Sequence, residues 1–525
     1  MKAYAICLIA FIPIGLVAQQ TTIPDPNFEQ ALIDLNLDTG IPDGYVPTSN
    51  VSALDSLNVS SYMINDLTGI EDFGALIYLD CSANWIGSLD LSQNVLLTDL
   101  NCSGNYLTSF IVNQNVNLEY LDCSVSGITS IDLTNNPNLD FLDCGGNQIT
   151  SIDLSQNAAL KYLMCQATQL TALDLSNNTS LIEVYCSTSP ALTTLIVSQC
   201  SQLRELWCHD SQISNLDVTG NTALEILYCG FTQISGLDLT QNTQLNTLNC
   251  SQAPLLTLDL TQNISLRSLW CDRTELTTLD LSQNVNLNRV TCSECELTSL
   301  ELPSTDSLEW VNCDKNHLSQ LDLTSNPQWR GLNCRNNLIT NLDVSLNPEL
   351  RIISCPENLL LGLDLSNNNM LFGLWLFDNP FLCLNVKNGN NAGFTTFSCG
   401  DTPNLTCMEV DDPAYSAMYW FTVDSTVTFS ENCMNTCSSV GISEHHVPSP
   451  CFYPNPTNGY STLELPYISD QVHITLRTLQ GTIVFIEKLP SKQQVGIVIN
   501  EPPGTYILTV ENSSGLFKSI MVIKE

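Results

Sequence analysis

Apolar residues recur every 21 positions along most of this chain. The repeating unit reads L-x-x-L-x-C-x-x-N-x-L-T-x-L-D-L-S-x-N-x-x, and residues 139–159 (LDFLDCGGNQITSIDLSQNAA) show it nearly intact. One unit buries about six apolar groups worth about 1.5–3 kcal/mol each, whereas fixing its backbone costs about 1–2 kcal/mol per residue. A single unit therefore cannot fold alone, and the pattern predicts a solenoid of stacked repeats.

Fourteen cysteines occupy one position of this unit. They follow one another at 21 residues, with one 22-residue step after Cys186, and are Cys81, Cys102, Cys123, Cys144, Cys165, Cys186, Cys208, Cys229, Cys250, Cys271, Cys292, Cys313, Cys334 and Cys355. Val59 and Leu376 stand in the same place in an earlier and a later repeat. We therefore expect about sixteen repeats over residues 54–382.

Alternation within x-x-L-x-C-x-x predicts one short strand per repeat, with Leu and Cys turned inward and the flanking residues turned outward. Parallel pairing of these strands would form the concave face, with roughly 5 Å of rise per repeat. At that spacing neighbouring cysteines come within disulfide range, but parallel Cβ vectors do not converge well. We expect free, buried thiols that pack as small hydrophobes.

The unit resembles the leucine-rich-repeat family, whose L-x-x-L-x-L-x-x-N/C-x-L signature it matches with Cys in the third apolar place. The resemblance implies an α/β-type, strand-dominated solenoid with a parallel concave sheet and an irregular convex side. It says little about function, because one fold carries many functions. The asparagine three residues after each ladder cysteine is called the ladder asparagine. Looser backbone pairing is expected where it is replaced, at Thr168, Ser211, Thr232, Ala253 and Thr274.

The segment before the repeats divides into two parts. Residues 1–18 have the charged start, short apolar run and small residues of a secretory signal peptide. Residues 19–53 contain IPDPNFEQALIDLNLD, in which Asp25 as N-cap and Pro26 at the first helical position predict a helix. This helix would cap the open core with an apolar face made of Phe28, Ala31, Leu32 and Leu35.

Cysteines that break the 21-residue rhythm follow the repeats, so residues 383–440 are expected to form a disulfide-containing C-terminal cap. In an exported protein they are disulfide candidates, and proximity favours Cys383 with Cys399 and Cys407 with Cys433. They could also pair between molecules or stay free. The segment MYWFTVDSTVTFS, residues 418–430, alternates like an edge strand that would seal the solenoid.

Residues 441–447 form a short polar linker to a tail, residues 448–525, that predicts a small all-β sandwich. Strands are expected over 472–478, 482–487, 495–499, 505–510 and 516–523. The tail resembles the C-terminal sorting domain of the type IX secretion system in Tyr453, Pro454, Asn455, Pro456, Asn458, Gly459, Gly504 and Lys518. This implies passage through the outer membrane, removal of the tail, and either release or anchoring to lipopolysaccharide.

Composition agrees with export. With 54 acidic against 16 basic side chains, the net charge of −38 repels phosphate backbones and anionic headgroups, so nucleic acid is not an expected partner. No segment reaches about 18 consecutive apolar residues, so no transmembrane helix is expected. The expected location is outside the cell or on its outer surface.

Cys208, His209 and Asp210 adjoin in ELWCHDSQI and suggest a nucleophile with its base. Repeat phase turns Cys208 inward and His209 outward, so the two side chains cannot share a hydrogen bond. The chain also has no G-x-S-x-G, H-E-x-x-H or phosphate-loop motif. We expect no catalytic residue and no cofactor, and a surface hydrolase is the remote alternative.

Metal binding has three weak indications. The run of Asp34, Asn36, Asp38 and Gly40 hints at a calcium loop, although the glycine is one place late. His445 and His446 adjoin in the linker, where a solvated pair is the alternative. An acidic stripe on the other face would attract divalent cations or be held by turn N–H groups; it comprises Asp90, Asp132, Asp153, Asp174, Asp217, Asp238, Asp259, Asp280, Asp322, Asp343 and Asp364. We expect no metal site.

Outward positions of the predicted concave strands carry an oblique aromatic stripe. Its members are Tyr120, Phe141, Tyr162, Tyr185, Trp207, Tyr228, Trp270 and Trp310, and its polar neighbours are His209, Asp272, Asp314 and Arg335. Exposed aromatics on a rigid sheet are typical of recognition surfaces. The alternative is that aromatics favour strands and shield one another.

These observations favour an exported recognition or adhesion protein that binds a protein or glycan ligand on its concave face. A structural surface-layer protein that self-associates is the alternative.

Overall fold

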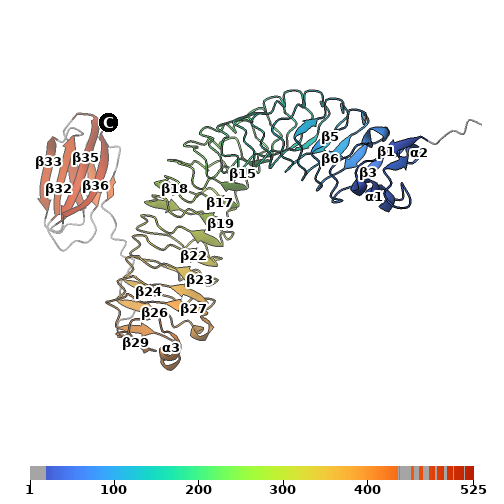
Figure 1. Ribbon diagram of the computed structural model, residues 1–525. Helices are drawn as coiled ribbons and strands as arrows, with labels where there is room; N and C mark the ends of the chain where they lie inside the picture. Colours follow the sequence, from blue (N-terminus) through green and yellow to red (C-terminus); the bar gives the residue numbers. More distant parts are fainter. Residues whose placement is uncertain are drawn as a thin grey trace, which may run out of the picture. The chain divides into compact units, whose positions relative to one another are not determined.

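The computed structural model describes residues 19–434, 437, 451–453, 460–464, 472–478, 482–489, 494–499, 502–512 and 515–524. The expected signal peptide, the linker with His445 and His446, and Pro454, Asn455, Pro456, Asn458 and Gly459 lie outside these residues. Within them, the chain forms a repeat solenoid and a separate C-terminal β unit (Figure 1).

The N-terminal cap contains the predicted helix. Helix α1 (Pro26–Asp34) begins after Asp25, whose carboxylate accepts hydrogen bonds from the backbone N–H groups of Asn27 and Phe28. Phe28, Ala31 and Leu32 are buried as expected, but Leu35 ends the helix and is 42% exposed, so its assignment to the buried face was wrong. The remaining elements of this region are β1 (Gln20–Thr22), β2 (Tyr45–Pro47), α2 (Thr48–Val51) and η1 (Ile70–Asp72).

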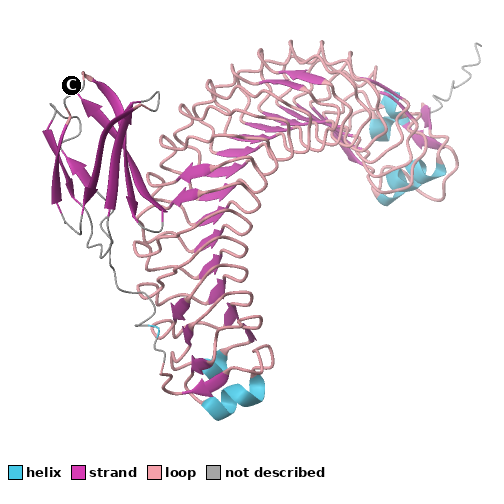
Figure 2. Cartoon of the chain, turned by 90° about the vertical axis from the view of Figure 1, so that its left-hand side faces the viewer, coloured by secondary structure: helices cyan, strands magenta, loops and turns pink. Residues whose placement is uncertain are grey.

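The repeats build one long parallel ladder, in which each strand pairs in register with the strand of the next repeat. It has seventeen strands, one more than the repeat count: β3 (Ser56–Asn58), β4 (Tyr78–Asp80), β6 (Asp99–Asn101), β8 (Tyr120–Asp122), β9 (Phe141–Asp143), β10 (Tyr162–Met164), β12 (Glu183–Tyr185), β14 (Glu205–Trp207), β15 (Ile226–Tyr228), β16 (Thr247–Asn249), β17 (Ser268–Trp270), β19 (Arg289–Thr291), β21 (Trp310–Asn312), β22 (Gly331–Asn333), β23 (Ile352–Ser354), β25 (Gly373–Trp375) and β27 (Thr396–Ser398). Figure 2 shows this ladder on the inner side of the solenoid, with loops on the outer side.

A second row of short strands lies at the L-D-[LV] segment of some repeats or at the equivalent place in others. It comprises β5 (Ser88–Asp90), β7 (Ser109–Ile111), β11 (Ala172–Asp174), β13 (Thr194–Ile196), β18 (Thr278–Asp280), β20 (Ser299–Glu301), β24 (Gly362–Asp364), β26 (Cys383–Asn385), β28 (Cys407–Glu409) and β29 (Thr428–Ser430). The other side of the solenoid is thus mostly irregular, as the resemblance implied.

The core between these rows consists of leucines and thiols. All fourteen ladder cysteines are fully buried and free, which confirms that they act as packing groups. Burial raises their thiol pKa, for example to about 12 at Cys186 and Cys229. Such thiols stay protonated at neutral pH and are poor nucleophiles.

Buried asparagines link successive repeats on both sides of the core. The Asn147 side chain donates to the carbonyls of Cys123 and Cys144, and its oxygen accepts from the N–H groups of Ser126 and Ile128. Where the asparagine is replaced, the hydroxyls of Ser211 and Thr232 reach only the carbonyl of their own repeat. The side-chain link between repeats is thus lost there, but the expected loosening does not extend to the backbone, because the Cys208 and Cys229 N–H groups still donate to the carbonyls of Tyr228 and Asn249 at 2.8 Å.

The ladder continues into the expected C-terminal cap. β27 has the x-L-x-C pattern in Thr396, Phe397, Ser398 and Cys399, and the Cys399 N–H donates to the Thr422 carbonyl. Cys399 is buried and free, so it is a further ladder cysteine and its expected pairing with Cys383 was wrong. Cys383 is bonded to Cys437 instead. Cys407 and Cys433 are each disulfide-bonded, and their mutual pairing stays a prediction.

The edge strand expected over residues 418–430 forms only at its end, as β29. Its first residues belong to helix α3 (Pro413–Tyr419), where Asp412 caps the N–H groups of Ala414 and Tyr415 and Pro413 occupies the first turn. This is the same Asp-Pro signal that starts α1, and its helix overrides the alternating pattern. One 3-10 turn, η2 (Asn391–Gly393), precedes it.

The C-terminal unit is a sandwich of two antiparallel sheets. One contains β30 (Cys451–Tyr453), β31 (Tyr460–Glu464) and β34 (Gln494–Val498), and the other β33 (Ile483–Leu489), β32 (Val472–Thr478), β35 (Gly504–Asn512) and β36 (Gly515–Lys524). The sequence predicts five of these strands and misses β30 and β31. The unit has its own core of Leu463, Ile474, Leu476, Ile497, Ile499, Tyr506, Leu508 and Val522.

Candidate functional site: the concave aromatic stripe

The predicted stripe lies on the ladder as the alternation requires. Each of its eight aromatics takes the first or third place of a strand, flanking a buried central residue, and each is half-buried. Because the in-register ladder sets neighbouring strands roughly 4.8 Å apart, aromatics at equivalent positions come within ring contact.

The first group joins three consecutive strands. The rings of Tyr120 and Phe141 stack with centroids 4.5 Å apart and an interplanar angle of 9°. Tyr162 follows at 6.5 Å from Phe141 in a tilted arrangement. This group therefore presents a nearly continuous row of ring edges.

The second group is centred on Trp207. Its indole stacks on Tyr228 at 4.4 Å and meets Tyr185 at 5.4 Å, while Trp270 lies 6.4 Å beyond Tyr228. Tyr228 and Trp270 come from β15 and β17, so their rings approach each other across the intervening strand β16. The side chains thus shield one another, as the alternative explanation requires, and still form one surface.

Two polar ring atoms at the centre of this group have no partner among the described residues. They are Nε1 of Trp207 and Nδ1 of His209, both covered from solvent. The His209 ring lies 6.0 Å from the Trp207 ring and 6.3 Å from Tyr228. A buried N–H without an acceptor costs about 1–3 kcal/mol, and such unsatisfied groups tend to occur at functional sites.

Trp270 and Trp310 line a third part of the stripe. Together with Ser268 and Arg289 they line a depression of about 340 Å³, which also includes the ion pair of Arg330 with Glu309. The Trp310 ring covers Gly331 so closely that a Cβ there would overlap it. The Trp310 ring therefore occupies the space that a side chain at position 331 would need.

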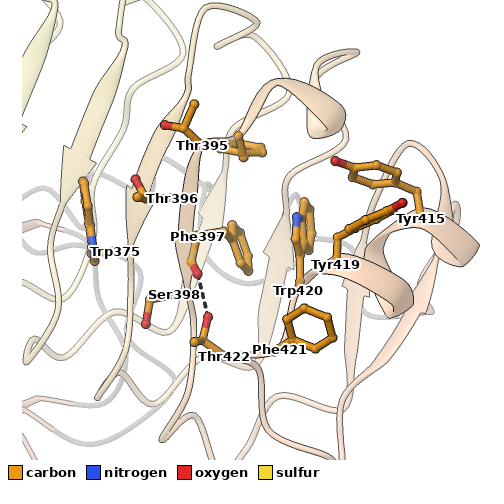
Figure 3. Close-up of a pocket in the computed structure, with 11 residues that line it drawn as sticks. Trp375, Thr395, Thr396, Phe397, Ser398, Tyr415, Tyr419, Trp420, Phe421 and Thr422 are labelled. Carbon is orange, nitrogen blue, oxygen red and sulfur yellow. Dashed lines mark hydrogen bonds between the residues drawn. The ribbon is translucent and has the colours of Figure 1, made fainter.

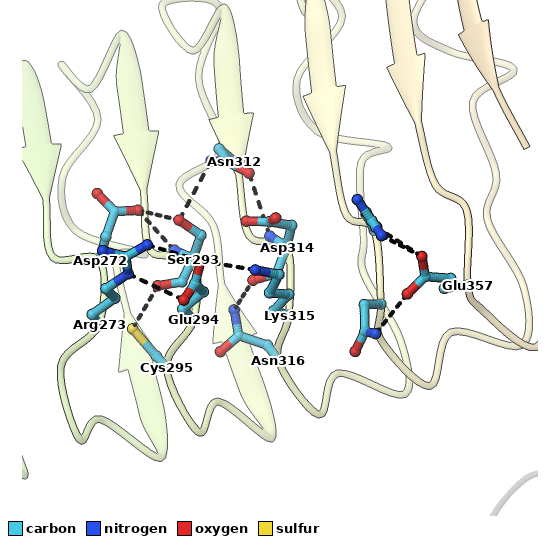
Figure 4. A network of polar contacts seen from close by, with 12 residues as sticks. Asp272, Arg273, Ser293, Glu294, Cys295, Asn312, Asp314, Lys315, Asn316 and Glu357 are labelled. Carbon is cyan, nitrogen blue, oxygen red and sulfur yellow. Dashed lines mark hydrogen bonds and ion pairs between the residues drawn. The ribbon is translucent and has the colours of Figure 1, made fainter.

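The remaining polar neighbours belong to a charged network further along the ladder (Figure 4). Asp272 accepts hydrogen bonds from the Thr291 and Ser293 hydroxyls and from the Ser293 N–H. Arg335 pairs with Glu357. Asp272 and Arg335 are thus already engaged by their neighbours.

Glu294 shows the balance of charge in this network. Hydrogen bonds from Arg273 and Lys315 lower its pKa to about 2. Burial instead raises the pKa of Asp314. The network is therefore a mutual arrangement of ion pairs, and the structure does not bring it into contact with Trp207.

Carboxylates flank both aromatic groups. The Tyr185 hydroxyl donates to Glu183 and Glu205, and burial together with these carboxylates raises the pKa of Tyr185. Beside the first group, burial raises the pKa of Asp143, and neighbouring Asp122 adds to the effect. The stripe therefore combines apolar ring surface with negative potential.

The structure agrees that Cys208 and His209 do not form a dyad. Cys208 is fully buried with a pKa raised by burial, whereas His209 lies on the concave face beside Trp207, with its Nε2 3.8 Å from the Asp210 carboxylate. Among the described residues no group of three or more His, Cys, Asp or Glu is placed to hold a metal ion.

The acidic stripe of the other face is explained by local hydrogen bonds. The N–H two residues later donates to each of its aspartates, as from Ser92 to Asp90 and from Thr134 to Asp132, and these bonds lower the pKa of both carboxyls. The same bond recurs at the other nine positions.

Sequence reasoning missed a second aromatic group at the end of the ladder (Figure 3). Trp375, Phe397, Tyr415, Tyr419, Trp420 and Phe421 line a pocket of about 530 Å³. Trp375 was the signal available, since it occupies the stripe's row one position before Leu376. The others lie in the segment interpreted as a cap.

Comparisons with known proteins agree with this architecture. Residues 116–157 match the family model of leucine-rich repeats in two copies, and residues 451–524 match that of the secretion system C-terminal sorting domain. Of the residues quoted for sorting, Tyr453 ends β30, Gly504 begins β35 and Lys518 lies within β36. No curated protein shows a significant match to the chain.

Solved structures are similar in fold. The functional domain of InlJ from Listeria monocytogenes, which includes a cysteine ladder, aligns with a TM-score of 0.56 at 24% identity, over 97% of this chain and 99% of that one. A leucine-rich-repeat protein of Leptospira interrogans aligns with a TM-score of 0.53 at 20% identity, over 58% of this chain and 85% of its own. At these identities the likeness concerns the fold.

The sorting domain points to type IX secretion and hence to a protein that is secreted or held at the outer surface. In the part of the chain that the structure describes, no helix is long and apolar enough to cross a bilayer. The chain therefore contains leucine-rich repeats in a cysteine-ladder solenoid, followed by a C-terminal sorting domain that indicates export.

Proposed function

We propose that this exported protein is a recognition or adhesion protein that binds a partner protein through its concave aromatic stripe. The observation that carries the proposal is the second aromatic group, in which Trp207 and its stacked neighbours surround two ring nitrogens without partners. Large aromatic side chains at the centre of a rigid surface are the usual anchors of protein interfaces.

The charge of the face indicates the chemistry of the partner. Glu183, Glu205, Asp122 and Asp143 flank the aromatic groups, and none of them forms an ion pair among the described residues. A partner that offers lysine or arginine side chains beside apolar ones would relieve this negative potential and stack its cations on the rings. We therefore expect a basic partner surface.

Catalysis does not fit the same residues. The thiols are buried with raised pKa values, and His209 is turned away from Cys208. A binding surface needs only shape, ring area and charge, which the ladder supplies without moving parts.

The test is capture of surface proteins on an array by the full chain. The double variant Trp207→Ala/Trp270→Ala should weaken the captured interactions about 30-fold or more for each anchor removed. Its melting temperature should fall only slightly, because both rings are half-buried and outside the leucine core.

Trp85→Ala/Tyr106→Ala is the matched control, since these aromatics are 53% and 67% exposed and lie outside the ladder strands. It should bind like the wild type. Undiminished capture by the Trp207/Trp270 variant would refute the stripe. Self-association with no captured partner would instead support a structural surface-layer role.

A further inference from the structure

The pocket at the end of the ladder is a second, separate candidate site. It lies between β25, β27 and the segment from α3 to Thr422, and Figure 3 shows Phe397, Trp420 and Tyr419 side by side with Trp375 at the opposite end. Its first stripe-row residue, Trp375, comes three ladder strands after Trp310. Nothing in the proposed concave interface requires this pocket.

The floor of the pocket is rigid. Trp420 is only 7% exposed and stacks on Phe397 with centroids 4.0 Å apart and an interplanar angle of 15°. Phe394 and Phe429 meet the Trp420 ring edge-on at 5.9 and 5.8 Å. These contacts fix the indole before any ligand arrives.

The rim, in contrast, offers ring surface to solvent. Phe421 is 83% exposed and Tyr419 is 55% exposed, and Tyr419 pairs with Tyr415 at 4.6 Å on helix α3. A phenylalanine so exposed leaves its apolar area in water, which a bound ring would remove.

The polar side-chain groups of the pocket are uncharged: the Thr, Ser and Tyr hydroxyls and the indole N–H groups of Trp375 and Trp420. Thr395 and Thr422 donate to the carbonyls of Phe372 and Phe397, which leaves their oxygens as acceptors. Thr396 and Ser398 have hydroxyls without a partner among the described residues, so both can donate and accept.

No charged side chain lines this pocket, although the chain carries 70 charged residues as 54 acidic and 16 basic. A charged ligand loses water on entering such a pocket and finds no counter-ion there. The lining instead suits a molecule with flat C–H faces for the rings and with neutral hydroxyls for Thr396 and Ser398. The volume of about 530 Å³ lies within the usual range for small ligands, about 300–1,000 Å³.

A neighbouring depression of about 390 Å³ shares Ser398, Phe421 and Thr422 with the pocket. Its Asp424 carboxylate is already held by the N–H groups of Asp401 and Thr402. Phe421 thus stands between two adjoining hollows, an arrangement that fits a chain of sugar units better than a single one. We propose that this terminal aromatic pocket binds an uncharged oligosaccharide, independently of the concave stripe.

The test is titration of the full chain with maltohexaose, cellohexaose, mannohexaose, laminarihexaose and xylohexaose, followed by calorimetry and intrinsic tryptophan fluorescence. At least one should bind and shift the fluorescence. Phe421→Ala and Tyr419→Ala should each weaken that binding about tenfold or more. Both side chains are exposed, so the variants should keep the wild-type melting temperature.

Tyr106→Ala removes a comparably exposed tyrosine far from the pocket and should leave binding unchanged. Trp207→Ala/Trp270→Ala should also bind the sugar normally, which separates this site from the proposed protein interface. The proposal is overturned if none of the neutral oligosaccharides binds, or if Phe421→Ala and Tyr419→Ala bind as tightly as the wild type. Binding of oligolysine or chitosan oligomers alone would assign the pocket to cations instead.

Discussion

At the scale of single residues, the negative charge of Asp143 is unfavourable in the folded protein without a bound partner. It lies on β9 directly beside Asp122 on β8, and burial raises its pKa above the usual value of about 3.9. The Gly145 N–H, 2.9 Å from its carboxylate, offsets only part of this. The ionised carboxylate is thus less favourable in the folded chain than in the unfolded chain.

Asp143→Asn should therefore stabilise the protein at neutral pH. A carboxyl whose pKa is raised by folding adds its full share to the free energy of unfolding below its unfolded-state pKa. That stabilisation is lost as the pH rises through the folded-state pKa. The difference in melting temperature between variant and wild type should be positive near pH 7 and shrink as the pH falls toward about 3. Asparagine can still accept the Gly145 hydrogen bond.

Asp90→Asn is the matched control with the opposite sign. The Ser92 N–H lowers the pKa of Asp90, so its contribution is present above the unfolded pKa and lost as pH falls. This variant should be destabilised near neutral pH, with the difference vanishing in acid. If both variants follow the same pH trend, the burial argument for Asp143 is wrong.

At the scale of elements, the asparagine ladder is interrupted where the second aromatic group begins. Ser211, Thr232 and Ala253 replace the ladder asparagine in three consecutive repeats, whose strands carry Trp207, Tyr228 and Asn249. The hydroxyls of Ser211 and Thr232 bond within their own repeat, whereas Asn147 reaches the preceding one. The stacked rings of Trp207 and Tyr228 lie on the concave face of these same repeats.

Exchanging these side chains should shift stability in opposite directions. Asn147→Thr removes the bond to the Cys123 carbonyl and the acceptor for Ser126 and Ile128, which should cost about 1–3 kcal/mol. Thr232→Asn should recreate the inter-repeat link and gain about 0.5–1.5 kcal/mol. Urea unfolding and local amide hydrogen exchange measure both, and exchange shows whether the change is confined to adjacent repeats.

Asn215→Thr is the control, because this asparagine is exposed and should leave stability unchanged. Equal effects of Asn147→Thr and Asn215→Thr would show that the buried amide does not connect the repeats.

The elements that the sequence predicts are those repeated many times or marked by a cap. Periodicity predicts the ladder, the inward cysteines and the outward aromatics, because one register applies to every repeat. It fails after Leu376, where the spacing to Cys399 grows to 23 residues and the Asp-Pro signal at Asp412 starts a helix inside an alternating pattern. The terminal pocket was missed for the same reason, since its rings come from segments without a shared period.

Ring contacts and unpartnered atoms are beyond sequence reasoning. The alternation places Trp207 on the concave face, but whether its Nε1 finds an acceptor depends on rotamers that packing decides. Likewise the sequence identifies the cysteines after the repeats as disulfide candidates but not their connectivity, and the bond between Cys383 and Cys437 spans 54 residues.

At the scale of the whole molecule, the solenoid and the sorting domain are separate bodies with separate tasks. The solenoid core is closed by α1 at one end and by α3 with β29 at the other, and the C-terminal sandwich has its own apolar core. Delivery is therefore assigned to the tail, and the recognition that we propose would belong to the solenoid.

Removing residues 441–525 should accordingly change location without changing the fold of the solenoid. The truncation keeps Cys437 and hence its bond to Cys383, so the melting temperature should match that of the full chain. In a bacterium with a type IX secretion system, the truncated protein should accumulate in the periplasm, whereas the full chain reaches the surface or the medium. Cell fractionation and protease accessibility on intact cells measure this. Residues 441–525 fused behind a signal peptide and a monomeric fluorescent protein should carry that reporter outward, and surface delivery of the truncated chain would contradict the assignment of sorting to the tail.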